Sequence, residues 1–151
     1  MLNKNNFIIG ACTAVVIVAL VIAGLFADTK DIQNGGKTIT FLHANNTLEH
    51  WAGLSWKQEE KLDTAGMLFT FRRQEEREFW MRGMQFDLDV IWIQNGKIVK
   101  IDSGVKAPQD GEVPERMSSA PFKIDAVIEV PAGKAAELGL KRGITLKDLV
   151  D

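Results

Sequence analysis

The chain has 151 residues, of which 46% are hydrophobic and 25% charged, so it can form one globular domain with a hydrophobic core plus a terminal segment. Its formal net charge of −2 argues against nucleic acid as a partner. The single cysteine, Cys12, lies in an apolar N-terminal run, which excludes an internal disulfide and a cysteine-based metal site from the folded part.

The first predicted element is a membrane segment. The run from Phe7 to Phe26 contains twenty residues without a charge or a proline, which is the length that a helix needs to cross a bilayer. Neither Ala23 nor Ala27 completes a good small-x-small cleavage site, so residues 1–27 are predicted to be a retained anchor or an uncleaved signal, with a cleaved signal peptide as the alternative. Because a short amino-terminal tail normally stays in the cytoplasm, we expect a single-pass protein of the cell membrane whose domain lies outside the cytoplasm.

A polar stretch separates this segment from the folded domain. Residues 28–37 contain Asn34-Gly35-Gly36 and are predicted to be a flexible linker, followed by a domain over residues 38–151. The domain begins with a strand at Lys37–His43, and a short helix capped by Asn46 or Thr47 follows. The next predicted elements are a charged loop over residues 57–64, a strand over residues 66–71 and a solvated connection, RRQEER, over residues 72–77.

The stretch from Glu78 to Val105 predicts a strand, a break at Gly83 and a β-hairpin. Its first hairpin strand alternates apolar residues on one face with a second set on the other, which is the period of a β-strand. Asn95-Gly96 suits a two-residue type I′ turn, so residues 97–102 are expected to return as the antiparallel partner. The two predicted faces are Phe86, Leu88, Val90 and Trp92, and Asp87, Asp89, Ile91 and Ile93.

The C-terminal third predicts one more long strand and one more short helix. Residues 106–119 contain two prolines and a glycine and are expected to be irregular. A strand is predicted at Phe122–Val130, then a helix at Ala132–Leu138 that ends at Gly139, and a last short strand at Ile144–Leu146.

Several motifs in this order resemble a known family. They are Gly53-Leu54, GMLFTF, FWMRGM, LDVIWI, GKIV and EVPAGKAAELGLKRG, spread from about Ala44 to Leu146, and together they are similar to domain of unknown function 192. The resemblance implies an α+β, mainly β domain, a small partly open barrel or sandwich with short helices, and it implies no established activity. This chain departs from the family pattern at Asp87, where proline is common, and at His50 and Ser55 in the helix block.

The hairpin suggests a pair of carboxylates. If the Asn-Gly turn sets the register, Asp89 lies opposite Asp102, and like charges in a cross-strand pair need a compensating partner. Arg82 is a candidate cation, and the alternatives are a raised pKa on one acid, a bound metal or exposure to water. An acid–base pair would also suit a hydrolase or a lyase.

Aromatic side chains supply the second candidate feature. Trp80 points away from its neighbours Phe79 and Met81 and is predicted to line a groove. The two histidines, His43 and His50, do not have the spacing of metal ligands, so no metal and no cofactor is predicted.

Together these patterns predict a binding module rather than an enzyme. We expect the membrane-tethered domain to bind a small ligand, a glycan or an envelope protein through a groove near Trp80, Arg82, Asp89 and Asp102. The alternatives are a hydrolase or lyase that uses Asp89 and Asp102, and a structural accessory protein of an envelope complex that works through an apolar surface.

Overall fold

The computed structural model describes residues 28–149. The predicted membrane segment at Phe7–Phe26 lies outside this range, and its prediction is not tested by the structure. Within residues 28–149, no helix is long and apolar enough to cross a membrane.

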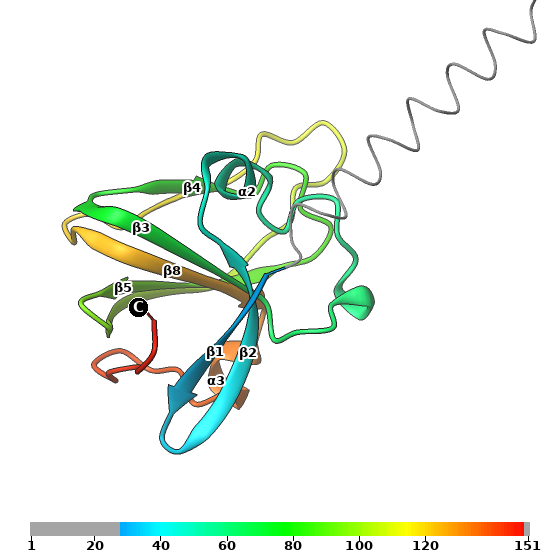
Figure 1. The fold of residues 1–151 in the computed structure, drawn as a ribbon. Coiled ribbons are helices and arrows are strands. Elements are labelled where there is room, and N and C mark those ends of the chain that lie inside the picture. Colours follow the sequence, from blue (N-terminus) through cyan, green and yellow to red (C-terminus); the bar gives the residue numbers. More distant parts are fainter. Residues whose placement is uncertain (1–27, 150–151) are drawn as a thin grey trace, which may run out of the picture.

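The domain is mainly β, as predicted, and is built on one mixed six-stranded sheet in the order β1-β2-β3-β8-β5-β6 (Figure 1). Only β2 and β3 pair in parallel; the other neighbours are antiparallel. A small second sheet joins β4 to β7. The strands are β1 Thr29–Asn34, β2 Lys37–Ala44, β3 Met67–Glu75, β4 Glu78–Trp80, β5 Leu88–Gln94, β6 Lys97–Val105, β7 Arg116–Ser118 and β8 Ile124–Pro131, and the helices are α2 Thr47–Ala52, the 3-10 turn Glu59–Lys61 and α3 Lys134–Glu137.

The segment expected to be a flexible linker is part of the sheet. Residues 29–34 form β1, and Gly35-Gly36, both at positive φ, make the tight turn into β2. Ile32 of β1 is fully buried and faces Ile39 of β2 across the ladder. The linker prediction is wrong because one buried apolar residue and a two-glycine turn are enough to add a strand to a sheet that is already present.

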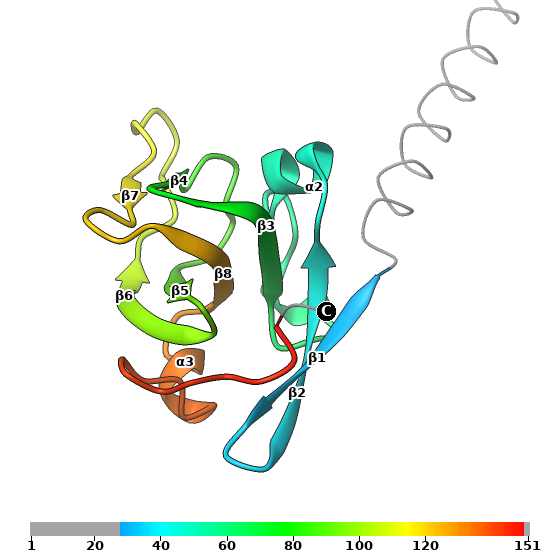
Figure 2. The same cartoon turned by 60° about the vertical axis from the view of Figure 1, so that its left-hand side comes forward.

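Both faces of the sheet are buried, which explains the apolar runs in β5 and β8. One face carries a core with Phe41, Ile91 and Ile128 and is covered by α3 and the C-terminal residues. The other face carries a core with Phe69 and Trp92 and lies under α2 and the small sheet of β4 and β7 (Figure 2). The two predicted faces of β5 therefore each enter a different core, in agreement with the alternation read from the sequence.

The hairpin turn is confirmed, but the register that was drawn from it is wrong. Asn95 and Gly96 both have positive φ, and Gln94 pairs with Lys97 as a two-residue turn requires. The register shifts twice on β6, so that Asp102 lies opposite Val90 and Val105 lies opposite Leu88. Each shift is a β-bulge, which places an extra residue on one strand and changes every later pairing.

The short helices are where the sequence predicts them. Asn46 caps α2 by accepting hydrogen bonds from the main-chain N–H groups of Leu48 and Glu49. The helix α3 ends before Gly139, which has a φ of 70°.

Two predictions outside the main sheet need correction. Residues 72–75 of the expected connection belong to β3, and Arg116–Ser118 of the expected irregular stretch pairs with β4 as β7. The expected last strand is reduced to isolated bridges, from Thr145 to Lys97 and from Lys147 to Gln33, which connect the two outer strands of the sheet.

Candidate ligand-binding cleft

Asp89, one of the predicted site residues, is buried and serves the fold. Its carboxylate accepts main-chain hydrogen bonds from Gly104, Gly133 and Ala135, with N···O distances of 2.9, 2.9 and 3.2 Å. These bonds fix the bulged end of β6 and the start of α3 to β5. The three main-chain donors thereby satisfy the carboxylate inside the protein without a cation.

Asp102, its predicted partner, lies on the opposite face of the sheet. Asp102 shares a face with Val90, and neighbouring residues of a strand point to opposite faces, so Asp89 points away from it. The Asp102 carboxylate accepts a 2.8 Å hydrogen bond from Trp92 Nε1 and forms a 3.0 Å ion pair with Lys100. The predicted pair of carboxylates does not form, and the hydrolase or lyase alternative loses the acid–base geometry on which it depended.

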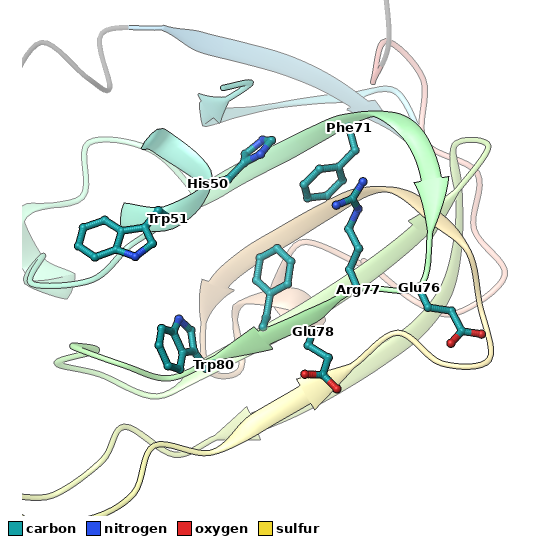
Figure 3. Close-up of a pocket in the computed structure, with 8 residues that line it drawn as sticks. His50, Trp51, Phe71, Glu76, Arg77, Glu78 and Trp80 are labelled. Carbon is teal, nitrogen blue, oxygen red and sulfur yellow. The ribbon is translucent and has the colours of Figure 1, made fainter. Parts of the chain in front are cut away.

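The structure instead opens a cleft between α2 and the small sheet (Figure 3). Its volume is about 460 Å³, which falls in the range of small-molecule sites. Figure 3 shows Trp51 from α2 and Trp80 from β4 at one end and Glu76 at the other. The lining residues are His50, Trp51, Phe71, Glu76, Arg77, Glu78, Phe79 and Trp80.

The aromatic residues of the cleft divide into a fixed floor and an exposed wall. Phe79 packs edge-on against Phe69 and Trp92, with ring centroids 5.2 and 5.5 Å apart, so it is held by the core. Trp80, the next residue of β4, points the other way and is 41% exposed, and Trp51 is 61% exposed. Trp80 therefore lies on the other side of β4 from Phe79, and both residues line the cleft, whereas a role of Trp80 in ligand binding stays a prediction.

The polar lining is led by Arg77. Its guanidinium carbon lies 3.8 Å from the ring centroid of Phe71, and Nη2 donates to the main-chain oxygen of Arg73 and pairs with Glu75. Within residues 28–149, its Nε is the one buried side-chain nitrogen or oxygen without a hydrogen-bond partner. The planar, permanently charged group is therefore positioned by stacking and still has unused donor capacity.

His50 forms the α2 side of the cleft beside this arginine. Its Nε2 lies 3.1 Å from the main-chain oxygen of Ala44, and its ring lies 4.7 Å from that of Phe71. Burial lowers the pKa of His50, and the hydrogen bond from His50 to Ala44 opposes this shift. The positive charge of the nearby Arg77 also lowers the pKa of His50. Because a carbonyl oxygen can only accept, Nε2 of His50 carries the proton that is donated to Ala44.

Arg82, the remaining predicted residue, lies beside the cleft rather than in its lining. Its guanidinium carbon is 5.2 Å from the ring centroid of Trp80, and that of Arg116 is 5.5 Å from the same ring. Arg116 also pairs with Glu78 at 3.7 Å. Of the four predicted site residues, the structure therefore brings together Trp80 and Arg82 and leaves Asp89 and Asp102 elsewhere.

Two functional candidates, Arg77 and Glu129, were not predicted from the sequence, although the alternation of side chains along the strands indicates where each of them points. Arg77 precedes Phe79 by two positions and so shares its inward side, a signal that the charged run RRQEER concealed. Glu129 of β8 is 5% exposed and lies opposite Met67 and Val90 in the core. Burial raises the pKa of Glu129 to about 8, against a hydrogen bond from the main chain of Leu54 that lowers it.

The histidines have other partners than a metal. His43 Nε2 lies 2.9 Å from the hydroxyl oxygen of Thr70, and His50 is bonded to Ala44 as described. In the part of the chain that the structure describes, no three histidine, cysteine or acidic residues lie close enough to hold a metal ion.

The fold and the cleft define a class of protein, namely a small, mainly β domain built around one mixed sheet, with an aromatic cleft at its side. The match to the family DUF192, Uncharacterized ACR, covers residues 30–147, and the chain belongs to that family. The resemblance read from the sequence motifs is thus confirmed.

Two crystal structures have the same fold. A protein of unknown function from Novosphingobium aromaticivorans is 26% identical, with a TM-score of 0.61 over 79% of this chain and 83% of that one. A protein from Sinorhizobium meliloti, described as a candidate transcription regulator, is 23% identical, with a TM-score of 0.63 over 80% of this chain and 93% of that one, a likeness that shows the fold alone. No curated protein matches the chain.

Proposed function

We propose that this protein is a membrane-tethered binding module, outside the cytoplasm, that holds a saccharide in the cleft between α2 and β4. The observation that carries the proposal is the pair of exposed tryptophans, Trp51 and Trp80, on the wall of the cleft. Besides Phe71 and Phe79, the other residues that line this cleft are polar or charged. The apolar face of a sugar ring stacks on tryptophan, while its hydroxyl groups require donors and acceptors around the rim.

The polar groups of the cleft suit hydroxyl groups better than a strongly charged ligand. Arg77 is the cationic group of the lining, Glu76 and Glu78 offer acceptors beside it, and burial lowers the pKa of His50. Positive and negative side chains alternate along the rim, so a net charge on the ligand gains little from the site. A neutral oligosaccharide of the cell envelope is the ligand class that this arrangement favours.

The attachment and the location of the domain are part of the same proposal. They are supported by the uncharged run Phe7–Phe26, which has the length that a helix needs to cross a bilayer. A domain so placed would meet envelope glycans.

The test is a titration of the full chain in lipid nanodiscs with neutral and acidic oligosaccharides, followed by tryptophan emission. We expect neutral oligosaccharides to bind, and Trp80→Ala to weaken binding about tenfold, which corresponds to about 1.4 kcal/mol. Trp56→Ala is the matched control, because Trp56 is 60% exposed but does not line the cleft. Equal loss in the two variants, or binding by acidic oligosaccharides alone, would contradict the proposed function.

A further inference from the structure

A second surface, next to the cleft, is distinguished by exposed apolar side chains. We call Leu48, Trp51 and Trp56 the α2 patch; their exposed fractions are 64%, 61% and 60%. Leu48 and Trp51 lie three positions apart on one side of α2, and the ring centroids of Trp51 and Trp56 are 6.1 Å apart. The patch holds three of the five large hydrophobic side chains that are exposed in residues 28–149.

The backbone and the ring of Trp56 are fixed at the surface by contacts with the rest of the fold. Trp56 has a φ of 60°, a conformation that is rare for a bulky residue. Its main-chain N–H donates to the oxygen of Gly83 at 2.7 Å, and Ser55 Oγ donates to the oxygen of Arg82 at 2.8 Å. The indole ring lies directly over Gly83, where a Cβ atom would come within 2.9 Å of it. The protein therefore keeps a tryptophan at its surface at a cost in backbone strain.

The place where the chain leaves the described domain indicates what meets this patch. The main-chain oxygen of Asp28 accepts a 2.9 Å hydrogen bond from His43, and β1 starts opposite the end of β2. The strand β2 leads directly into α2, so the start of β1 and the α2 patch lie at the same end of this strand pair (Figure 2).

The connection to the apolar run is short. Phe26 ends that run and Thr29 begins β1, so three peptide steps, at most about 11 Å, separate them. With β1 in place of a flexible linker, a domain anchored through Phe7–Phe26 stays within reach of the lipid headgroups. The α2 patch is on the side of the domain where β1 begins.

We propose that the α2 patch docks on the lipid bilayer, with Trp51 and Trp56 in the headgroup region and Leu48 at the acyl boundary. Tryptophan concentrates at membrane–water interfaces because its ring is apolar and its N–H is polar. Tethering makes the docking intramolecular, so a modest apolar patch is sufficient. Docking would turn the saccharide cleft, which shares Trp51, toward the membrane surface. This inference rests on the membrane attachment proposed above.

The tryptophans themselves provide the test, because all four lie after residue 50 and none lies in the apolar run. The full chain is reconstituted into vesicles of phosphatidylcholine and phosphatidylglycerol, with and without bromine on the acyl chains, and flotation is measured in parallel. Brominated lipids should quench up to about half of the emission, since two of the four tryptophans belong to the patch. Trp56→Phe should remove much of this quenching, and Trp80→Phe should leave it.

A second variant protects the test from a folding defect. Leu48→Ser changes an exposed side chain and leaves every tryptophan in place, and we expect it to reduce quenching at least twofold. Equal emission in brominated and plain vesicles that carry the protein would overturn the proposed docking of the patch but would leave the proposed membrane anchor in place. Failure to float with the vesicles would overturn the anchor and the docking together. A concentration-dependent emission of the chain in detergent, with no quenching in vesicles, would assign the patch to contact between copies and would also overturn the proposal. Saccharide binding is read independently through Trp80→Ala.

Discussion

The buried carboxyl of Glu129 accepts a hydrogen bond from the main-chain N–H of Leu54, and this contact connects the centre of the sheet to the turn that follows α2. Gly53, the residue before Leu54, lies next to the same carboxyl, since a Cβ atom there would be in ordinary van der Waals contact with Oε2 of Glu129 at 3.7 Å. The turn after the helix that carries Trp51 is thus bonded to a buried acid, and this acid has no ion-pair partner within residues 28–149. Its protonation state should therefore affect the stability of the domain.

Glu129→Gln tests this link through pH. Burial raises the pKa of Glu129 from 4.5 to about 8, so the folded state holds a proton that the unfolded state releases between these values. The stability that depends on this proton is complete below about pH 4.5, declines as the pH rises toward 8, and is constant above it. The contribution of Glu129 to the slope of the free energy of unfolding against pH should reach about 1 kcal/mol per pH unit, and this contribution should be absent from the Gln variant.

The measurement is urea unfolding of the full chain in detergent across this pH range. The difference between wild type and variant isolates Glu129, because His50, whose pKa burial lowers, contributes with the opposite sign below its ordinary value of 6.5. Glu137→Gln is the control, since this glutamate is exposed on α3. An identical slope in wild type and Glu129→Gln would show that Glu129 is already ionised in the folded protein.

Asp89→Asn and Asp102→Asn separate the two predicted site acids. Asp89 accepts three main-chain hydrogen bonds, and an amide in its place loses the charge and directs its own N–H groups at donors. We expect a loss of roughly 3 kcal/mol in the free energy of unfolding. For Asp102 the amide oxygen can still accept from Trp92, and the partly exposed ion pair with Lys100 is worth below about 1 kcal/mol. Chemical denaturation measures both, and similar losses would contradict the assignment of Asp89 as the structural acid.

Gly83→Ala should displace Trp56. Gly83 has a φ of 73°, and the added Cβ atom would lie 2.9 Å from the indole of Trp56. Backbone strain and steric crowding together should therefore lower the free energy of unfolding by about 2 kcal/mol. Gly111→Ala is the matched control, because Gly111 also has a positive φ but nothing within 4 Å, and its loss should be about 1 kcal/mol. Thermal unfolding gives the stabilities and emission spectra report the environment of Trp56. Unchanged emission in Gly83→Ala would mean that the ring does not rest on this glycine.

The proposed orientation predicts a labelling pattern on intact cells. An amine reagent that does not cross membranes should label Lys61, which is exposed on the domain, and should leave Lys4 unlabelled until the cells are lysed. Mass spectrometry of the modified peptides measures both sites. Labelling of Lys61 only after lysis would place the domain in the cytoplasm and refute the extracytoplasmic part of the proposal.

Much of this protein follows from its sequence alone, because the determining signals are local. Alternation placed β5 and Trp80, Asn95-Gly96 fixed a type I′ turn, and Asn46 and Gly139 marked the limits of two short helices. Each of these depends on the conformational preference of a few adjacent residues, which any fold containing them respects.

Only the tertiary structure decided which side chains meet. One register shift in β6, between Ile98 and Lys100, placed Asp102 opposite Val90 instead of Asp89. Such a bulge depends on contacts with the neighbouring strands rather than on the turn that starts the hairpin. The pairing of β4 with β7, across a long irregular stretch, brought Arg116 to Trp80 at the side of the cleft. Residue spacing sets the side of its own strand on which a side chain lies. The residue that it meets comes from another part of the chain, and the packing of the whole domain decides which residue that is.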